Sequence, residues 1–174
     1  LLRDLVVLDH NLLLLHHHEV KSFGLQKRID IWWGGREHNW SLMVLLGTLI
    51  QSSEEWESST VRLCVVIDSE SEAPKARKRL QRALARSKLR AETEVFIRQV
   101  EEETPFDVIH RESEEASLTL LGLRTPDPKE GKEYLSRIST MLEGMGSVLL
   151  VRASSRFEAT DVLFETEEQQ GEES

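Results

Sequence analysis

The feature that most constrains the fold is a series of short apolar runs that alternate with helix-like segments. Four of these runs have the length of a strand and almost no charged residue: 29–33, 61–67, 118–121 and 148–151. A strand without polar alternation is typical of a parallel sheet that helices cover on both faces. A fifth run, 92–97, alternates polar and apolar residues and therefore indicates an edge strand.

Helix signals fill the intervals between these runs. Asn39 can cap a buried helix over 40–52, and Pro74 suits the first turn of the next helix. Further helices are expected over 106–114 and after the cap formed by Asp127-Pro128. The apolar stripes expected to face the core are Ala76, Leu80, Ala83, Leu84 and Ser87 after Pro74, and Leu135, Ile138 and Leu142 in the last helix. Such alternation forms βαβ units, so the predicted fold class is α/β, a three-layer sandwich around a five-stranded parallel sheet.

The two ends of the chain differ from this repeating part. Residues 1–28 contain a strand-length run, 12–15, and we expect them to be the end of a preceding lobe plus a linker. The α/β domain is expected over 29–164, with a further edge strand at 159–164. Residues 165–174 carry five glutamates and no large apolar side chain, which predicts a disordered acidic tail.

Charge and cysteine content exclude several classes of protein. The formal net charge is −9, which argues against a protein that binds nucleic acid through a generally basic surface. Cys64 is the single cysteine of the chain, so no disulfide can form within it, as is usual in a reducing compartment. The most apolar stretch, 40–50, is shorter than the roughly 20 residues that a membrane-spanning helix needs.

Three parts of the chain carry a resemblance to a known family. They are the double-tryptophan segment Lys27-Arg28-Ile29-Asp30-Ile31-Trp32-Trp33 with the leucine-rich segment 41–46, Trp56 with Val61-Arg62-Leu63, and 134–144 with Val148-Leu149-Leu150-Val151-Arg152. Together they are similar to the C-terminal cytosolic domain of the cation–chloride cotransporters, of the prokaryotic sodium/potassium/chloride type. The chain departs from that pattern at Ala153-Ser154, where the family often has glycines.

The resemblance implies both a fold and a role. The family's domain is similar in fold to universal stress proteins, which implies the strand order 3-2-1-4-5 with the strand of 29–33 at the centre. The implied role is a regulatory and dimerisation domain on the cytoplasmic side of the cell membrane, without enzymatic activity or a cofactor. Its implied partners are a second copy and the transmembrane domain of the same protein, which would carry out ion symport.

A nucleotide-binding sensor of the universal-stress type is the alternative. Gly34-Gly35 follows a strand and precedes a helix, a geometry that can hold phosphate. Such a site also needs a Gly-x-x-Gly loop after the fourth strand. Here the corresponding segment is Gly122-Leu123-Arg124-Thr125, in which Thr125 replaces the second glycine. A tight turn is therefore the preferred interpretation of the glycine pair.

Metal binding and nucleophilic catalysis find little support in the sequence. On an extended strand His16 and His18 would share a face, with Glu19 beside them, but no second cluster supplies further ligands at a recognisable spacing. Cys64 lies within an apolar run and should behave as a small hydrophobic residue. Trp32 and Trp33 are expected in the core on opposite faces of the sheet, whereas an interface role for Trp40 or Trp56 stays open.

The most unusual local feature is a concentration of positive charge. Eight basic residues without an acidic neighbour occur between 75 and 90: Lys75, Arg77, Lys78, Arg79, Arg82, Arg86, Lys88 and Arg90. One interpretation is an ordinary solvated helix face, and the other is a surface for anionic lipid headgroups or for an acidic partner.

Overall fold

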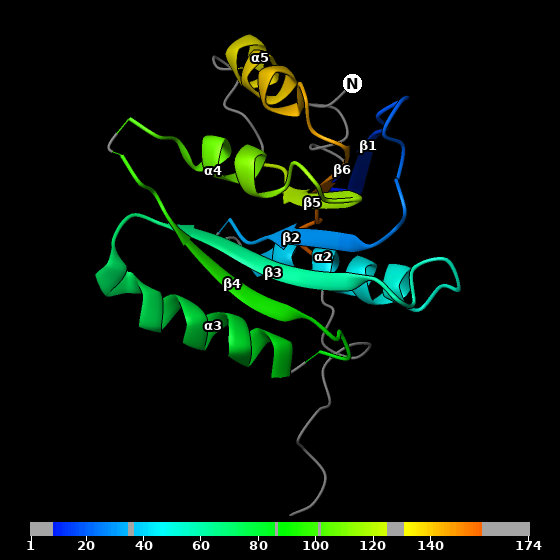
Figure 1. Ribbon diagram of the computed structural model, residues 1–174, viewed down its shortest axis with the longest axis horizontal. Coiled ribbons are helices and arrows are strands. Elements are labelled where there is room, and N and C mark those ends of the chain that lie inside the picture. Colours follow the sequence, from blue (N-terminus) through cyan, green and yellow to red (C-terminus); the bar gives the residue numbers. More distant parts are fainter. Residues whose placement is uncertain (1–8, 35–36, 86, 101, 125–130, 158–174) are drawn as a thin grey trace, which may run out of the picture.

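The computed structural model describes residues 9–34, 37–85, 87–100, 102–124 and 131–157 of the 174-residue chain (Figure 1). The strands are β1 (Leu12–His16), β2 (Arg28–Trp32), β3 (Thr60–Ile67), β4 (Glu92–Ile97), β5 (Leu118–Gly122) and β6 (Ser147–Arg152). The helices of this part are α2 (Glu37–Gln51), the short 3₁₀ helix η1 (Glu70–Glu72), α3 (Ala73–Ala85), α4 (Pro105–Glu112) and α5 (Gly131–Leu142).

All six strands form one sheet in the order β1-β6-β5-β2-β3-β4. The strands β2 to β6 are all parallel to their neighbours in the sheet, except that β6 also pairs with β1 in the antiparallel direction. The five parallel strands lie in the order β4-β3-β2-β5-β6, which is the order 3-2-1-4-5 when they are counted from β2. The expectation of a five-stranded, wholly parallel sheet is wrong, because β1 adds a sixth, antiparallel strand. The edge position expected for 92–97 is confirmed, since β4 ends the sheet.

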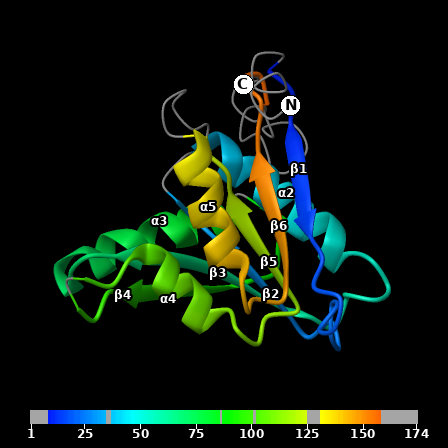
Figure 2. The same cartoon turned by 90° about the horizontal axis from the view of Figure 1, so that it is seen from above.

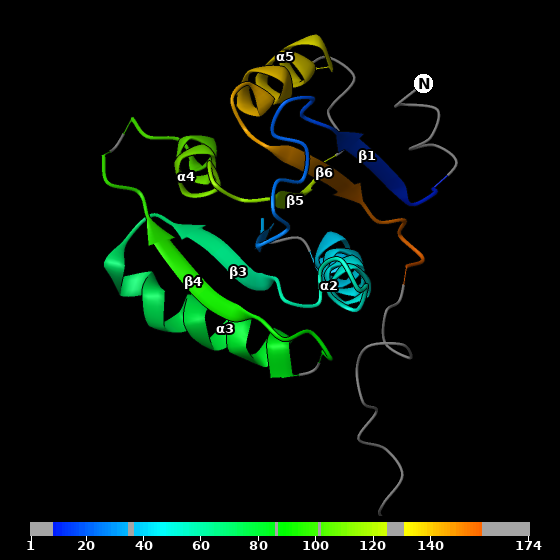
Figure 3. The ribbon, with the colours of Figure 1, turned by 45° about the vertical axis from the view of Figure 1, so that its right-hand side comes forward.

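Helices cover both faces of the sheet and divide the core into two layers (Figure 3). On one face α2 and α3 bury Met43 and Leu80 against the inward side chains of β2 and β3. On the other face α4 and α5 bury Val108 and Met141 against β5 and β6. Neighbouring residues of a strand point to opposite faces, so a strand covered on both sides must be apolar throughout. This arrangement is the three-layer sandwich that the apolar runs predict.

The strand β1 lies within 1–28, the segment expected to end a preceding lobe, yet it belongs to the sheet of the α/β domain (Figure 2). The residues just before it tie its start to the chain that follows β6. Asn11 Oδ1 accepts a hydrogen bond from the backbone N–H of Ser154 at 2.8 Å. Asp9 accepts from Ser155 twice, from the backbone N–H at 2.8 Å and from the hydroxyl at 2.5 Å.

Two helices differ from their expected form. Asn39 is not an N-cap: α2 begins at Glu37, so Asn39 is in its first turn and its side chain bonds to the sheet instead. In α5 the buried residues are Tyr134 and Met141, and the expected stripe residue Leu135 is 55% exposed. The core therefore meets α5 about one residue away from the face that the leucines mark.

Three expectations from the sequence lie outside the described residues. They are the cap at Asp127-Pro128, the edge strand at 159–164 and the tail at 165–174.

Candidate functional site

A cavity of about 710 Å³ opens at the carboxyl ends of β2, β3 and β5. Its walls come from the residues that end these strands, 32–34, 65–68 and 121–124, and from α3, α4 and α5. The carboxyl ends of adjacent parallel strands meet at one edge of a sheet, and ligands of open α/β folds bind there. The cavity is therefore at the position where this fold offers a binding site.

Cations and aromatic rings stand together around this cavity. Arg79 of α3 places its guanidinium 4.3 Å from the centre of the Trp33 ring, and Arg124 lies 4.7 Å from that of Tyr134. Lys75, one helical turn before Arg79, also lines the cavity. Such an arrangement of flat apolar surfaces and positive charges suits a ligand with both an aromatic and an anionic part.

Acidic side chains also line this cavity. Asp68 pairs with Arg98 at 2.7 Å, and Glu72 accepts a hydrogen bond from the backbone N–H of Asp68 at 3.2 Å. Gly34 also lines the cavity, whereas Gly35 and Thr125 lie outside the described residues.

Asn39 holds two strand ends beside this cavity. Its Nδ2 donates to the carbonyl oxygen of Leu123 at 2.9 Å, and its Oδ1 accepts from the backbone N–H of Ala153 at 2.9 Å. The side chain thus joins α2 to the chain that leaves β5 and to the chain that leaves β6. It serves the fold and does not cap the helix that follows the glycine pair.

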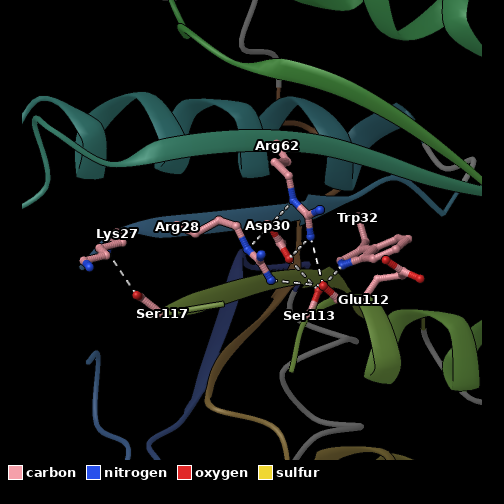
Figure 4. Close-up of polar contacts among 8 residues, drawn as sticks. All are labelled: Lys27, Arg28, Asp30, Trp32, Arg62, Glu112, Ser113 and Ser117. Atoms are coloured by element: carbon pink, nitrogen blue, oxygen red, sulfur yellow. Dashed lines mark hydrogen bonds and ion pairs between the residues drawn. The ribbon is translucent and has the colours of Figure 1, made fainter. Parts of the chain in front are cut away.

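A second polar cluster is buried in the middle of the sheet (Figure 4). Asp30 of β2 has no solvent exposure, and its carboxylate accepts two hydrogen bonds from Arg62, at 2.8 Å from Nε and 2.7 Å from Nη2. Arg28 Nε approaches the same carboxylate at 3.4 Å. The hydrogen bonds to Asp30 raise the pKa of Arg62 above its ordinary value.

This cluster fixes the end of α4 on the sheet. Ser113, which follows α4, donates its hydroxyl to Asp30 Oδ2 at 2.8 Å and accepts from Trp32 Nε1 at 2.8 Å. Both Arg28 and Arg62 donate to the carbonyl oxygen of Glu112 at 3.0 Å. Positive charge at the C-terminal end of a helix also complements its dipole.

This cluster was not predicted from the sequence, although two of its residues, Asp30 and Arg62, are recognisable there. Asp30 and Arg62 are opposite charges within apolar strands, and the parallel register of β2 and β3 pairs them directly. Two isolated charges of opposite sign in neighbouring buried strands indicate an ion pair, because a lone buried charge is costly. Nothing in the sequence marks Ser113 as their partner.

The candidate nucleophile and the candidate metal ligands do not form a site. Cys64 is fully buried, and burial raises the pKa of its thiol well above the ordinary value. No group of three or more His, Cys, Asp or Glu in the described residues could hold a metal ion. The expectation that His16 and His18 share a strand face is wrong, because β1 ends at His16 and His18 Nδ1 accepts from the backbone N–H of Lys21 at 3.0 Å.

Trp32 and Trp33 lie on opposite faces of the sheet, as the sequence indicates. Trp32 belongs to the core layer beneath α4 and α5, and Trp33 packs against the opposite layer. Trp40 and Trp56, for which an interface role was open, are 6% and 9% exposed and belong to the same layer as α2.

The basic residues singled out by the sequence are on α3 and on the loop after it. Arg86 lies outside the described residues. The other seven are all exposed: Lys75, Arg77, Lys78, Arg79, Arg82, Lys88 and Arg90. Only Lys75 and Arg79 of this set also line the cavity.

Within the described residues, no helix has the length and hydropathy required to cross a membrane. No protein-family model matches the chain, and no curated protein matches it. Among solved structures, the chain is similar to the cytoplasmic domain of a prokaryotic cation chloride cotransporter, with a TM-score of 0.67 and 19% sequence identity. The similarity covers 91% of this chain and 58% of the other, so the chain spans less than two thirds of the structure it matches. The resemblance suggested by the sequence is confirmed for the fold: this chain is folded like the cytoplasmic domain of a cation–chloride cotransporter.

Proposed function

We propose that this chain is a regulatory and association domain on the cytoplasmic side of a membrane cation–chloride cotransporter. The observation that carries the proposal is the similarity of fold over 91% of the chain to the cytoplasmic domain of such a transporter. The double-tryptophan strand supports it independently, since this segment resembles the family in sequence and forms the centre of the sheet.

The proposed role is one of association, not of catalysis. The thiol of Cys64 is buried with a raised pKa, and the fully buried carboxylate of Asp30 is engaged by two arginines and a serine. Ion symport would be carried out by a transmembrane domain of a longer protein, and the part of this chain that forms the sheet, from β1 to β6, would be the regulatory domain next to it.

Chloride-coupled uptake tests this function. Cells expressing the full-length gene product should take up rubidium in a chloride-dependent manner, relative to cells with an empty vector. Deletion of 9–157 should change the rate of that uptake, and the point variant Asp30→Ala, which weakens the domain without removing it, should change it in the same direction. Rubidium uptake that is independent of chloride would show that the proposal is wrong.

We also propose that two copies associate through a surface other than α3. Like charges that meet across a two-fold axis repel, so the exposed cations of α3 are a poor self-contact. Tethering in one membrane raises effective concentration to about the millimolar range, so a weak dimer suffices. Sedimentation at rising concentration should show reversible association that the double variant Lys78→Glu/Arg82→Glu leaves intact. A monomer at all concentrations contradicts the dimer, and loss of association in the variant contradicts the surface.

A nucleotide sensor is the second candidate, and the cavity at the carboxyl ends of the strands favours it. The cavity combines aromatic and cationic side chains. Against it, Thr125 replaces the glycine that would let the backbone approach a phosphate. We expect calorimetry with ATP and with ADP to show no tight binding, and micromolar affinity would favour this second function.

A further inference from the structure

We propose that the basic face of α3, formed by Lys75, Lys78, Arg79 and Arg82, binds the anionic surface of a phospholipid bilayer. The inference rests on the proposed function, because a domain attached to a membrane transporter is held close to such a surface. It adds a partner and the residues that recognise it.

The four residues lie on one side of the helix. Their spacing of three, four and seven residues places them in one row, because α-helical side chains repeat every 3.6 residues. From Lys75 to Arg82 the row is about 10 Å long, at 1.5 Å per residue. The opposite side of α3 holds Ala76 and Leu80, which are 8% and 0% exposed and face the sheet. The packing of the helix therefore presents the row outward.

The charges of this face are not neutralised within the described part of the protein. None of the four side chains forms an ion pair with a carboxylate of the described residues. Arg79 packs instead on the Trp33 ring, a contact that orients its guanidinium and leaves its charge unpaired by an acid. Of the acidic residues just before the helix, Glu72 lines the same cavity as Lys75 and Arg79 but forms an ion pair with neither.

A net charge of −9 does not prevent binding to an anionic surface. At physiological ionic strength charges are screened beyond about 8 Å, so a surface that touches α3 senses the local row more than the distant carboxylates. Each basic residue near an anionic leaflet strengthens binding by about fivefold. Lys78 and Arg82 are exposed and do not line the cavity, so both can meet a plane of headgroups, with Lys75 and Arg79 beside them at the cavity wall. A nucleic acid would place a much larger anionic body against the acidic remainder of the surface.

Vesicle sedimentation tests the proposal with the intact chain. At low ionic strength the protein should bind vesicles of 30% phosphatidylserine in phosphatidylcholine, should bind pure phosphatidylcholine weakly, and should dissociate as salt rises. The variant Lys78→Gln/Arg82→Gln should bind about 25-fold more weakly, at about fivefold per cation. Circular dichroism should show the same spectrum for the variant as for the unaltered protein, so that a loss of binding is not due to unfolding.

The matched control removes the same charge from another exposed helix. The variant Lys132→Gln/Arg137→Gln alters two exposed cations of α5 and should stay within about twofold of the unaltered protein. Equal losses in both variants would show an effect of net charge and overturn the proposal. Absence of binding to phosphatidylserine vesicles would also overturn it, as would binding to polyglutamate without binding to vesicles, which indicates an acidic protein partner. If vesicle binding fails while deletion of the domain still alters chloride-dependent uptake, this inference is lost and the proposed function stands.

Discussion

Replacing Asp30 by alanine should destabilise the protein more than any change at an exposed charge. The carboxylate lies between two half-buried arginine side chains, and it has no solvent exposure. The substitution removes four contacts at once: two hydrogen bonds from Arg62, one from Ser113 and the ion pair with Arg28.

The magnitude follows from what the substitution leaves behind. The side chains of Arg62 and Arg28 are only 15% and 26% exposed, so water cannot fully replace the carboxylate. Removal of one partner from a buried ion pair costs about 3–5 kcal/mol. We expect a value near the lower limit, because both guanidinium groups keep a hydrogen bond to the carbonyl oxygen of Glu112.

Two comparisons give the prediction its specificity. In Arg62→Met the carboxylate keeps Arg28 and Ser113, so the loss should be smaller, about 1.5–3 kcal/mol. Asp68→Ala removes an ion pair with Arg98 of the same 2.7 Å length, but Asp68 is 70% exposed. That control should cost about 1 kcal/mol or less.

Urea unfolding followed by tryptophan fluorescence measures all three changes, and the double variant Asp30→Ala/Arg62→Met completes a mutant cycle. The loss in the free energy of unfolding should decrease in the order Asp30→Ala, Arg62→Met, Asp68→Ala. If Asp30→Ala costs no more than Asp68→Ala, burial does not govern the strength of this ion pair.

Three substitutions and one chemical modification test other parts of the structure. Asn39→Ala should lower the free energy of unfolding by about 1–3 kcal/mol, because it leaves two buried backbone groups unpaired, and urea unfolding measures this. Gly47→Ala should cost about 1–3 kcal/mol despite the better helix propensity of alanine, since its Cβ would lie 2.6 Å from the side chain of Ile31 in β2. Gly131→Ala is the control in the same assay, and it should cost nothing because no neighbouring group lies within 4 Å of its Cβ. The Cys64 thiol should react with a disulfide reagent at pH 8 only after unfolding, and fast reaction of the native protein would contradict its burial. Hydrogen bonds from Thr104 lower the pKa of Asp107, so the stability that this carboxylate adds is present above its ordinary pKa and is lost as pH falls below about 4. In Asp107→Asn the free energy of unfolding should therefore fall less steeply below about pH 4, as urea unfolding at several pH values measures.

Much of the fold could be predicted because apolar runs report burial directly. The runs at 61–67, 118–121 and 148–151 became β3, β5 and β6, and the alternating run at 92–97 became the edge strand β4. Membership of β1 in the sheet was harder to predict, since Leu12–His16 pairs with residues more than 130 positions away and no local pattern encodes such a pairing.

The site was less predictable than the fold, because its polar contacts join distant parts of the chain. Asn39 has the residue type and position of an N-cap, but its amide bonds to chain segments 84 and 114 residues away. Of the stripe expected on α5, Ile138 and Leu142 pack against the core beside the buried Tyr134 and Met141, whereas Leu135 is 55% exposed. The clustering of charge on α3 was visible in the sequence, since it needs only helical periodicity.

The pairing of β1 with β6 gives the domain a response to mechanical force that depends on direction. Leu12 is opposite Arg152 and His16 is opposite Val148, so the chain enters the sheet beside the point where β6 ends. A pull along the axis of β1 would load all of its backbone hydrogen bonds to β6 in shear, so that they resist together. A sideways pull would instead first break the contacts of Asp9 and Asn11 with the chain after β6, and would then part the strands pair by pair from that end. Movement of a segment that precedes β1 would thus be transmitted to the sheet in one direction and absorbed by local opening in the other.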